Sequence, residues 1–205
     1  MAEQGTVNPW VVGSSPTLPA MLVIENIIPI KEQVYLYDYV SSSNFAYRFY
    51  RSHSFIRQVE RDWDHAPMQM SHHLYEVESD KASPHLPVIK PFVDKIQEQF
   101  GKIQLLRAKV NLTSPYPPKM NYEHQVPHVD LEYDNGDPVE HKVLLYYIND
   151  SDGPTYFFNE NYEVTDVVEP KQGMGVYFDG STIHAASNPV HSPFRFVLNI
   201  DFKVL

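Results

Sequence analysis

The chain has 205 residues, of which 42% are hydrophobic, and a formal net charge of −10. This length suits one domain with its own core, so we expect a single domain over residues 1–205. The negative charge disfavours nucleic acids and anionic membrane surfaces as partners. The chain has no cysteine, which excludes disulfides, thiolate metal sites and cysteine nucleophiles.

Residues 1–20 combine several prolines with Gly13 and carry no basic stretch followed by an apolar one. This segment therefore does not resemble a secretory signal, and we expect an irregular segment in a cytoplasmic protein. The apolar stretch after it is interrupted by Glu25, Asn26 and Pro29, and it is too short to span a membrane.

The first half of the chain predicts few regular elements. We expect a strand over residues 21–28, a helix over 31–42 and a strand over 45–50, whereas residues 51–90 show no clear period. Residues 87–100 are clearer, because Val88, Phe92, Ile96 and Phe100 form one apolar stripe and Gly101 follows as a C-cap. This pattern predicts an amphipathic helix on the outside of a sheet.

The second half predicts short strands separated by turns. Within residues 139–148, Val143, Leu145 and Tyr147 alternate with residues of the opposite face. About eight such strands suggest a sandwich or jelly roll with helices covering one sheet. We expect strands over residues 103–112, 126–132, 139–148, 155–158, 162–168, 175–178, 182–186 and 194–202.

One motif in these strands combines metal-ligand side chains. Pro127 disfavours a helix, so His128 and Asp130 are expected on an extended segment, where residues i and i+2 share a face. His184, on another predicted strand, is the candidate third ligand. Two histidines and one carboxylate with open positions are typical of non-haem Fe(II) oxygenases.

A cation follows His184 in the sequence. Alternation places Arg195, Val197, Asn199 and Asp201 on one face of the last strand. If the chain reverses over residues 188–193, this strand returns beside the strand of His184, with Arg195 inside the barrel. A buried arginine needs an anionic partner, and its planar guanidinium suits a carboxylate.

These segments resemble the Fe(II)- and 2-oxoglutarate-dependent oxygenases, in particular the prolyl-hydroxylase-like branch and its small bacteriophage-encoded members. The matching segments include His128-Val129-Asp130, His184 and Arg195, and the remaining ones are residues 71–75, 107–112, 142–149 and 153–155. The resemblance implies a mainly β fold with flanking helices, a double-stranded β-helix of the jelly-roll, cupin-like type. Residues 1–102 would then form an N-terminal strand and supporting helices, and residues 103–205 the β-helix core.

The resemblance also implies roles. His128, Asp130 and His184 would bind Fe(II), and Arg195, Tyr147 and Asn199 would hold 2-oxoglutarate. With O2, and ascorbate as an optional cofactor, the enzyme would be a dioxygenase. It would hydroxylate a C–H bond of a prolyl residue or related peptide while 2-oxoglutarate is converted to succinate and CO2. A phage-encoded member would work in the host cytoplasm on a peptide or protein substrate.

The residues alone also allow other interpretations. His128 and Asp130 can be an ordinary hydrogen-bonded pair, Tyr147 a core residue and Asn199 a structural one. A cupin-type metalloenzyme would keep the three metal ligands without using 2-oxoglutarate. A metal-binding interaction module would need no catalysis at all. The substrate could also be another amino-acid side chain, a nucleobase or a small molecule.

Overall fold

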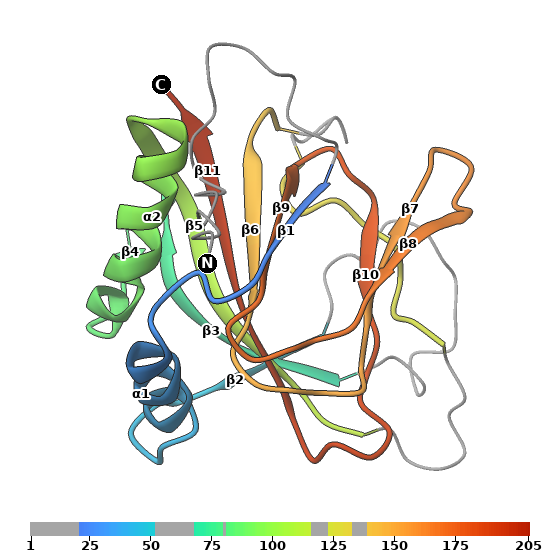
Figure 1. Ribbon diagram of the computed structural model, residues 1–205, viewed down its shortest axis with the longest axis horizontal. Helices are drawn as coiled ribbons and strands as arrows, with labels where there is room; N and C mark the ends of the chain where they lie inside the picture. Colours follow the sequence, from blue (N-terminus) through green and yellow to red (C-terminus); the bar gives the residue numbers. More distant parts are fainter. Residues whose placement is uncertain (1–20, 52–67, 80, 116–122, 133–138) are drawn as a thin grey trace, which may run out of the picture.

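The structure is a computed structural model that describes residues 21–51, 68–79, 81–115, 123–132 and 139–205. Two antiparallel sheets face each other, and two helices cover the outer face of the larger sheet (Figure 1). The expectation for residues 1–20 falls outside the described residues. The predicted sandwich with helices on one sheet is confirmed.

The larger sheet has eight strands. Its order is β1 (Met21–Ile24), β9 (Gly175–Asp179), β6 (Lys142–Tyr147), β11 (Arg195–Val204), β5 (Ile103–Thr113), β3 (Met68–Glu76) and β2 (Arg48–Arg51), with β4 (Lys81–Ala82) paired to β3. The smaller sheet has the order β10 (His184–Ala186), β7 (Thr155–Phe158) and β8 (Val164–Val168). Strands β5 and β11 are the longest neighbours and form the centre of the larger sheet.

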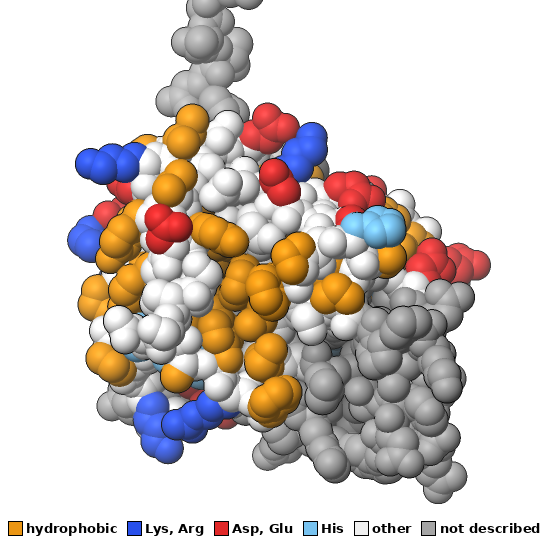
Figure 2. Space-filling view, turned by 90° about the horizontal axis from the view of Figure 1, so that it is seen from below, with side chains coloured by type: hydrophobic (Ala, Val, Ile, Leu, Met, Phe, Trp, Pro, Cys, Tyr) orange, Lys and Arg blue, Asp and Glu red, His pale blue; other side chains and the backbone are white. Residues whose placement is uncertain are grey.

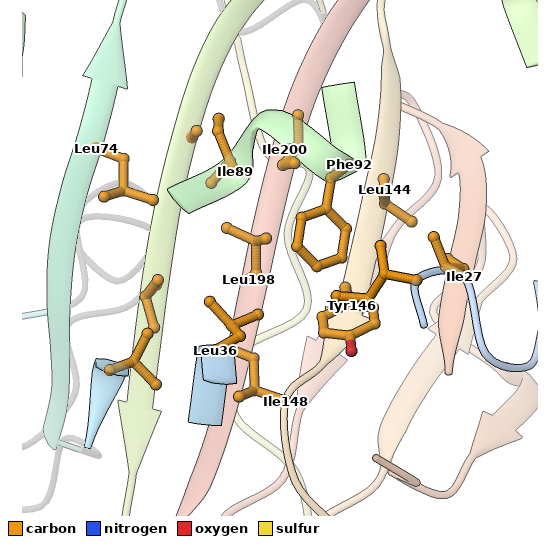
Figure 3. Packing of buried hydrophobic residues seen from close by; sticks show 14 of the residues in the cluster. Ile27, Leu36, Leu74, Ile89, Phe92, Leu144, Tyr146, Ile148, Leu198 and Ile200 are labelled. Carbon is orange, nitrogen blue, oxygen red and sulfur yellow. The ribbon is translucent and has the colours of Figure 1, made fainter. Parts of the chain in front are cut away.

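The helical layer consists of α1 (Ile30–Val40), the 3-10 helix η3 (Leu86–Ile89) and α2 (Lys90–Phe100). Gly101 ends α2 with φ = +80°, a conformation that glycine adopts without strain. Phe92 and Ile96 of α2 are fully buried, and Figure 3 shows Phe92 beside Tyr146 and Leu144 of the sheet. The ring of Phe92 lies edge-on to that of Tyr146, with 4.5 Å between centroids. None of the described helices is long and apolar enough to cross a bilayer.

The alternation of β6 and β11 separates two cores, as expected. One face of these strands, including Tyr146 and Leu198, packs under the helices. The other face, including Tyr147 and Val197, packs between the two sheets. The face of β11 that points between the sheets also carries three buried polar residues, namely Arg195, Asn199 and Asp201. The space between the sheets is therefore partly polar, which is where a site is expected.

Three expectations from the sequence need correction. Strand β3 was not predicted, although it pairs with β5 over most of its length. Residues 126–132 form no strand ladder but only isolated β-bridges, at His128, which pairs with His184, and at Glu132. Strand β11 does not return beside β10, because the turn at residues 188–193 takes the chain from the smaller to the larger sheet, where β11 pairs with β5 and β6.

The end of the molecule where β11 begins is apolar at its surface. Figure 2 shows this end from below, with hydrophobic side chains gathered in its centre. Phe196 contacts the rings of Tyr37, Tyr47 and Phe194, with centroids 5.9–6.1 Å apart. Apolar side chains thus lie at the outer surface here, and the polar residues described above lie inside.

We predict that Phe92→Ala lowers the free energy of unfolding by about 3–5 kcal/mol, because it leaves a cavity under α2. Urea unfolding followed by circular dichroism measures this loss. Phe49, which is 71% exposed, provides the matched control. Phe49→Ala should change stability by about 0.5 kcal/mol or less, and equal losses for the two variants would contradict the packing described for α2.

Candidate metal centre and cosubstrate site

Three candidate metal ligands converge between the sheets. His128 and His184 are joined by two backbone hydrogen bonds, of 2.9 and 3.0 Å, which bring the imidazole centroids to 4.9 Å. One ligand atom from each of His128, Asp130 and His184 lies within 4.8 Å of the other two. The side chains therefore meet through a β-bridge, although residues 126–132 do not form the strand that the sequence predicted.

Backbone carbonyl groups set the tautomers of both histidines. Nδ1 of His128 lies 3.0 Å from the Val126 carbonyl oxygen, and Nδ1 of His184 lies 3.0 Å from that of Thr182. A carbonyl oxygen only accepts, so each Nδ1 carries a hydrogen, which leaves Nε2 as the nitrogen with which each ring can bind a metal. Burial, with His184 nearby, lowers the pKa of His128 to about 4, which keeps this ring neutral at pH 7.

The carboxylate of Asp130 is surrounded by donors. Its Oδ1 accepts from Arg107 Nη2 at 2.6 Å and lies 3.5 Å from Lys109 Nζ. Its Oδ2 accepts from Asn199 Nδ2 at 3.0 Å. Burial alone would raise the pKa of the Asp130 carboxyl, but Lys109 and Arg107 hold it well below its usual value. Asp130 is therefore an anion in the folded protein.

These protonation states fit a divalent metal ion. Nε2 of His184 lies only 3.4 Å from Oδ2 of Asp130. In the neutral tautomer both atoms present lone pairs, which repel unless a cation or a proton lies between them. Two imidazole nitrogens and one carboxylate oxygen are ligands that Fe(II) accepts in this combination. The residues present thus suit a metal of this class.

A second polar cluster surrounds Arg195, which is 3% exposed. Its Nε donates to the Gly153 carbonyl at 2.7 Å, and its Nη2 donates to Thr155 Oγ1 at 2.8 Å. Tyr147 Oη donates to the same oxygen at 2.8 Å, and its ring lies below the guanidinium, 5.6 Å from Cζ. The Thr155 hydroxyl accepts twice and keeps its own hydrogen to donate.

Arg195 has no carboxylate partner among the described residues. No ion pair joins it to an acidic side chain there, and its hydrogen bonds to Gly153 and Thr155 use two of its five N–H donors. Burial lowers the pKa of Arg195, but an arginine stays charged in a protein. A buried guanidinium in this situation calls for an anionic ligand, and a carboxylate is the shape it matches best.

The six predicted site residues all lie in one or the other of these two clusters. His128, Asp130 and His184 form the first cluster. Asn199 joins them there by its hydrogen bond to Asp130, at the metal end rather than beside Arg195. Tyr147 joins Arg195 in the second cluster. Arg195 lies between the sheets as expected, although it comes from the larger sheet and not from a neighbour of β10.

Sequence reasoning missed Thr155, Arg107 and Lys109. Thr155 lies in a segment that was matched to the oxygenases, but its hydroxyl was given no role. A signal for the other two was present, because Arg107, Lys109, Asn111 and Thr113 alternate with apolar residues along β5. Such a strand has one polar face, and in the centre of a sandwich that face must meet polar partners.

No known protein-family description matches the sequence, and no curated protein matches it. Solved structures do match. An oxidoreductase of the 2OG-Fe(II) oxygenase family from Burkholderia pseudomallei superposes with a TM-score of 0.65 at 10% identity, covering 91% of this chain and 86% of that one. The chain has the fold of the iron(II)- and 2-oxoglutarate-dependent oxygenases. The predicted double-stranded β-helix is thereby confirmed.

Two further structures with this oxygenase fold differ in what they act on. The viral collagen prolyl hydroxylase of Paramecium bursaria Chlorella virus-1, solved with 2-oxoglutarate, has a TM-score of 0.55 at 14% identity and covers 91% of this chain and 97% of that one. The epimerase SnoN of nogalamycin biosynthesis has a TM-score of 0.61 at 12% identity, and the match covers 90% of this chain and 77% of SnoN. The resemblance to the prolyl-hydroxylase-like branch is thus confirmed at the level of the fold.

Asp152 ties together the two turns next to Arg195, and we predict that its charge stabilises them. It accepts backbone N–H groups of Val190, His191 and Ser192 at 2.7–3.2 Å. Although burial opposes ionisation, these bonds lower the pKa of Asp152 to about 2. Its stabilising effect is present above the unfolded-state pKa and is lost as the pH falls through about 2.

Asp152→Ala should lower the free energy of unfolding at pH 7 by about 2 kcal/mol, because three donors lose a charged acceptor. Chemical denaturation at several pH values measures the difference from the native protein, which should shrink as the pH approaches 2. Asp166→Ala on the exposed strand β8 serves as control. A difference that is the same at pH 2.5 and pH 7 would contradict the role given to the Asp152 charge.

Proposed function

We propose that this protein is an Fe(II)- and 2-oxoglutarate-dependent dioxygenase that hydroxylates a C–H bond in a peptide substrate. The observation that carries the proposal is the pairing of two features in one interior. Three metal ligands converge at one level, and a buried guanidinium without a described carboxylate partner lies at another. A metal site alone would not need the second feature.

The register of the smaller sheet supports the spacing between these features. His184 of β10 pairs with Phe157 of β7, and Thr155 lies two residues before Phe157 on the same strand. Two strand residues rise by about 7 Å. The guanidinium of Arg195, which is bonded to Thr155, is therefore offset from the level of His184 by a distance that a five-carbon dicarboxylate can bridge.

Each residue then has a defined task. His128, His184 and Asp130 would hold the metal through Nε2, Nε2 and Oδ2. Arg195 and the Thr155 hydroxyl would bind the far carboxylate of 2-oxoglutarate, and Tyr147 orients both of them from below. Bound iron and 2-oxoglutarate, with O2, supply the oxidising chemistry, while 2-oxoglutarate loses CO2 to give succinate. The apolar residues between the sheets, such as Val197 and Phe178, exclude water from this space.

The choice of a prolyl residue or related peptide as substrate rests on the resemblance and on one neighbour. The viral neighbour that covers most of this chain acts on collagen, as its name states. The epimerase SnoN shows that the same fold also serves small molecules. A panel of proline-containing peptides is therefore the first substrate set to test.

We expect the purified protein, with Fe(II), ascorbate and such peptides, to convert 2-oxoglutarate to succinate. His128→Ala should abolish this turnover, because it removes one of three metal ligands. Succinate is measured by mass spectrometry, together with a 16 Da mass increase of the peptide. His191→Ala, in an exposed turn, is the matched histidine control and should keep the activity. Failure of the metal-loaded native protein to bind 2-oxoglutarate would refute the cosubstrate assignment.

The main competing function is a cupin-type metalloenzyme without 2-oxoglutarate, and Arg195 distinguishes the two. We expect Arg195→Met to weaken 2-oxoglutarate binding to the Co(II)-loaded protein by about 100-fold or more, because a buried charge pair is lost. Arg195→Lys should recover part of the affinity, since lysine keeps the positive charge but lacks the planar guanidinium that binds a carboxylate through two N–H groups. Isothermal titration calorimetry measures both. Unchanged affinity in Arg195→Met would favour the cupin-type enzyme.

A further inference from the structure

Arg107 makes two hydrogen bonds to Asp130, whereas the predicted site residue Asn199 makes one. Its Nη2 donates to Asp130 Oδ1 at 2.6 Å, and its Nη1 donates to the Asp130 backbone carbonyl at 3.0 Å. One planar group thus holds both the side chain and the main chain of the same residue. This matters because residues 123–132 belong to no strand ladder and contain only isolated β-bridges, such as that of His128.

Arg107 is itself fixed from the other side. Its Nε donates to Asp201 Oδ2 at 2.7 Å, and Asp201 is fully buried. The two residues are cross-strand partners in the register of β5 and β11, at the centre of the larger sheet. His141, whose side chain is also fully buried, lies 3.6 Å from the other oxygen of Asp201. The guanidinium is therefore anchored to a fully buried carboxylate on the central strand pair of the larger sheet.

The two oxygens of Asp130 consequently differ. Oδ1 accepts a charge-assisted hydrogen bond from Arg107 and faces Lys109, whereas Oδ2 accepts only the neutral amide of Asn199 at 3.0 Å and lies 3.4 Å from Nε2 of His184. A carboxylate whose outer oxygen is held in a charge-assisted hydrogen bond offers only the inner oxygen to a metal. A carboxylate free to rotate could bind through both oxygens and occupy one more coordination position.

We infer that Arg107 is a positioning residue that makes Asp130 a one-oxygen ligand of the metal, through Oδ2. The inference rests on the proposed function, because it concerns the same three ligands. It adds that the open coordination positions needed for 2-oxoglutarate and O2 are kept open by an arginine on β5, with Asp201 as its anchor. Arg107 would act through Asp130 and not as a ligand of the metal.

The test uses two variants that separate geometry from charge. Arg107→Lys keeps the positive charge but cannot bond Asp130 and Asp201 together. Lys109→Met removes one positive charge near Oδ1 and leaves the Arg107 contacts in place. If Arg107 acts by geometry, Arg107→Lys weakens Co(II) binding by about 10- to 100-fold, the usual effect of losing such a contact. Lys109→Met keeps or increases the affinity, because a cation no longer repels the metal ion.

The metal alone is the probe, in calorimetric titrations of the full chain with Co(II). The visible absorption of bound Co(II) gives a second readout, since a change in the number of carboxylate oxygens alters its intensity. A role confined to stability would lower the melting temperature of the apo-protein and leave both the affinity and the spectrum of the folded fraction unchanged. That result would overturn the inference, as would a loss of affinity in Lys109→Met equal to that in Arg107→Lys.

A milder variant keeps the test decisive if Arg107→Lys does not fold. Asp201→Asn retains an oxygen acceptor for Arg107 Nε but removes the anchoring charge. We expect a several-fold loss of Co(II) affinity and the same spectral change, and native affinity with a native spectrum would overturn the inference. Failure of the proposed function is separate: tight Co(II) binding that depends on Arg107, in a native protein that does not bind 2-oxoglutarate, would refute the oxygenase and retain the positioning role.

Discussion

The structure depends on the burial of charge between two sheets. Asp130 and Asp201 are nearly or fully inaccessible, and the cation that joins them, Arg107, is also mostly buried. Charges in such a place are costly unless each has a partner with good geometry. The register of β5 and β11 provides that geometry by setting Arg107 opposite Asp201. The charged pair in the interior thus comes from the two central strands, and it contacts the candidate metal ligand Asp130.

The sequence was sufficient for those features that follow from a simple period. Alternation along β6 and β11 correctly separated the face under the helices from the face between the sheets. The apolar stripe and Gly101 located α2, and the strand over residues 155–158 agrees with β7 at both ends. The order of His128, Asp130, His184 and Arg195 on predicted extended segments also indicated which side chains the fold brings to its interior.

Other features depend on contacts between distant segments and were not accessible in this way. Strand β3 has histidines on both faces, so its sequence has no clean alternation, and its pairing with β5 decides its structure. The course of the chain after β10 was predicted wrongly because a turn sequence does not say to which sheet the next strand belongs. Thr155 was overlooked because a threonine in a strand is ordinary until its neighbours are known.

The two sheets contribute unequally to the candidate centre. His184 comes from the smaller sheet, and the segment with His128 and Asp130 is joined to that sheet by the β-bridge, whereas Asn199 and Arg107 reach Asp130 from the larger one. An ion held by the triad would thus bind ligands on the side of the smaller sheet, and Arg107 and Asn199 would connect its carboxylate ligand to the larger sheet. Because only the folded chain brings the three ligands together, the binding free energy of the ion would add to the stability of the folded state.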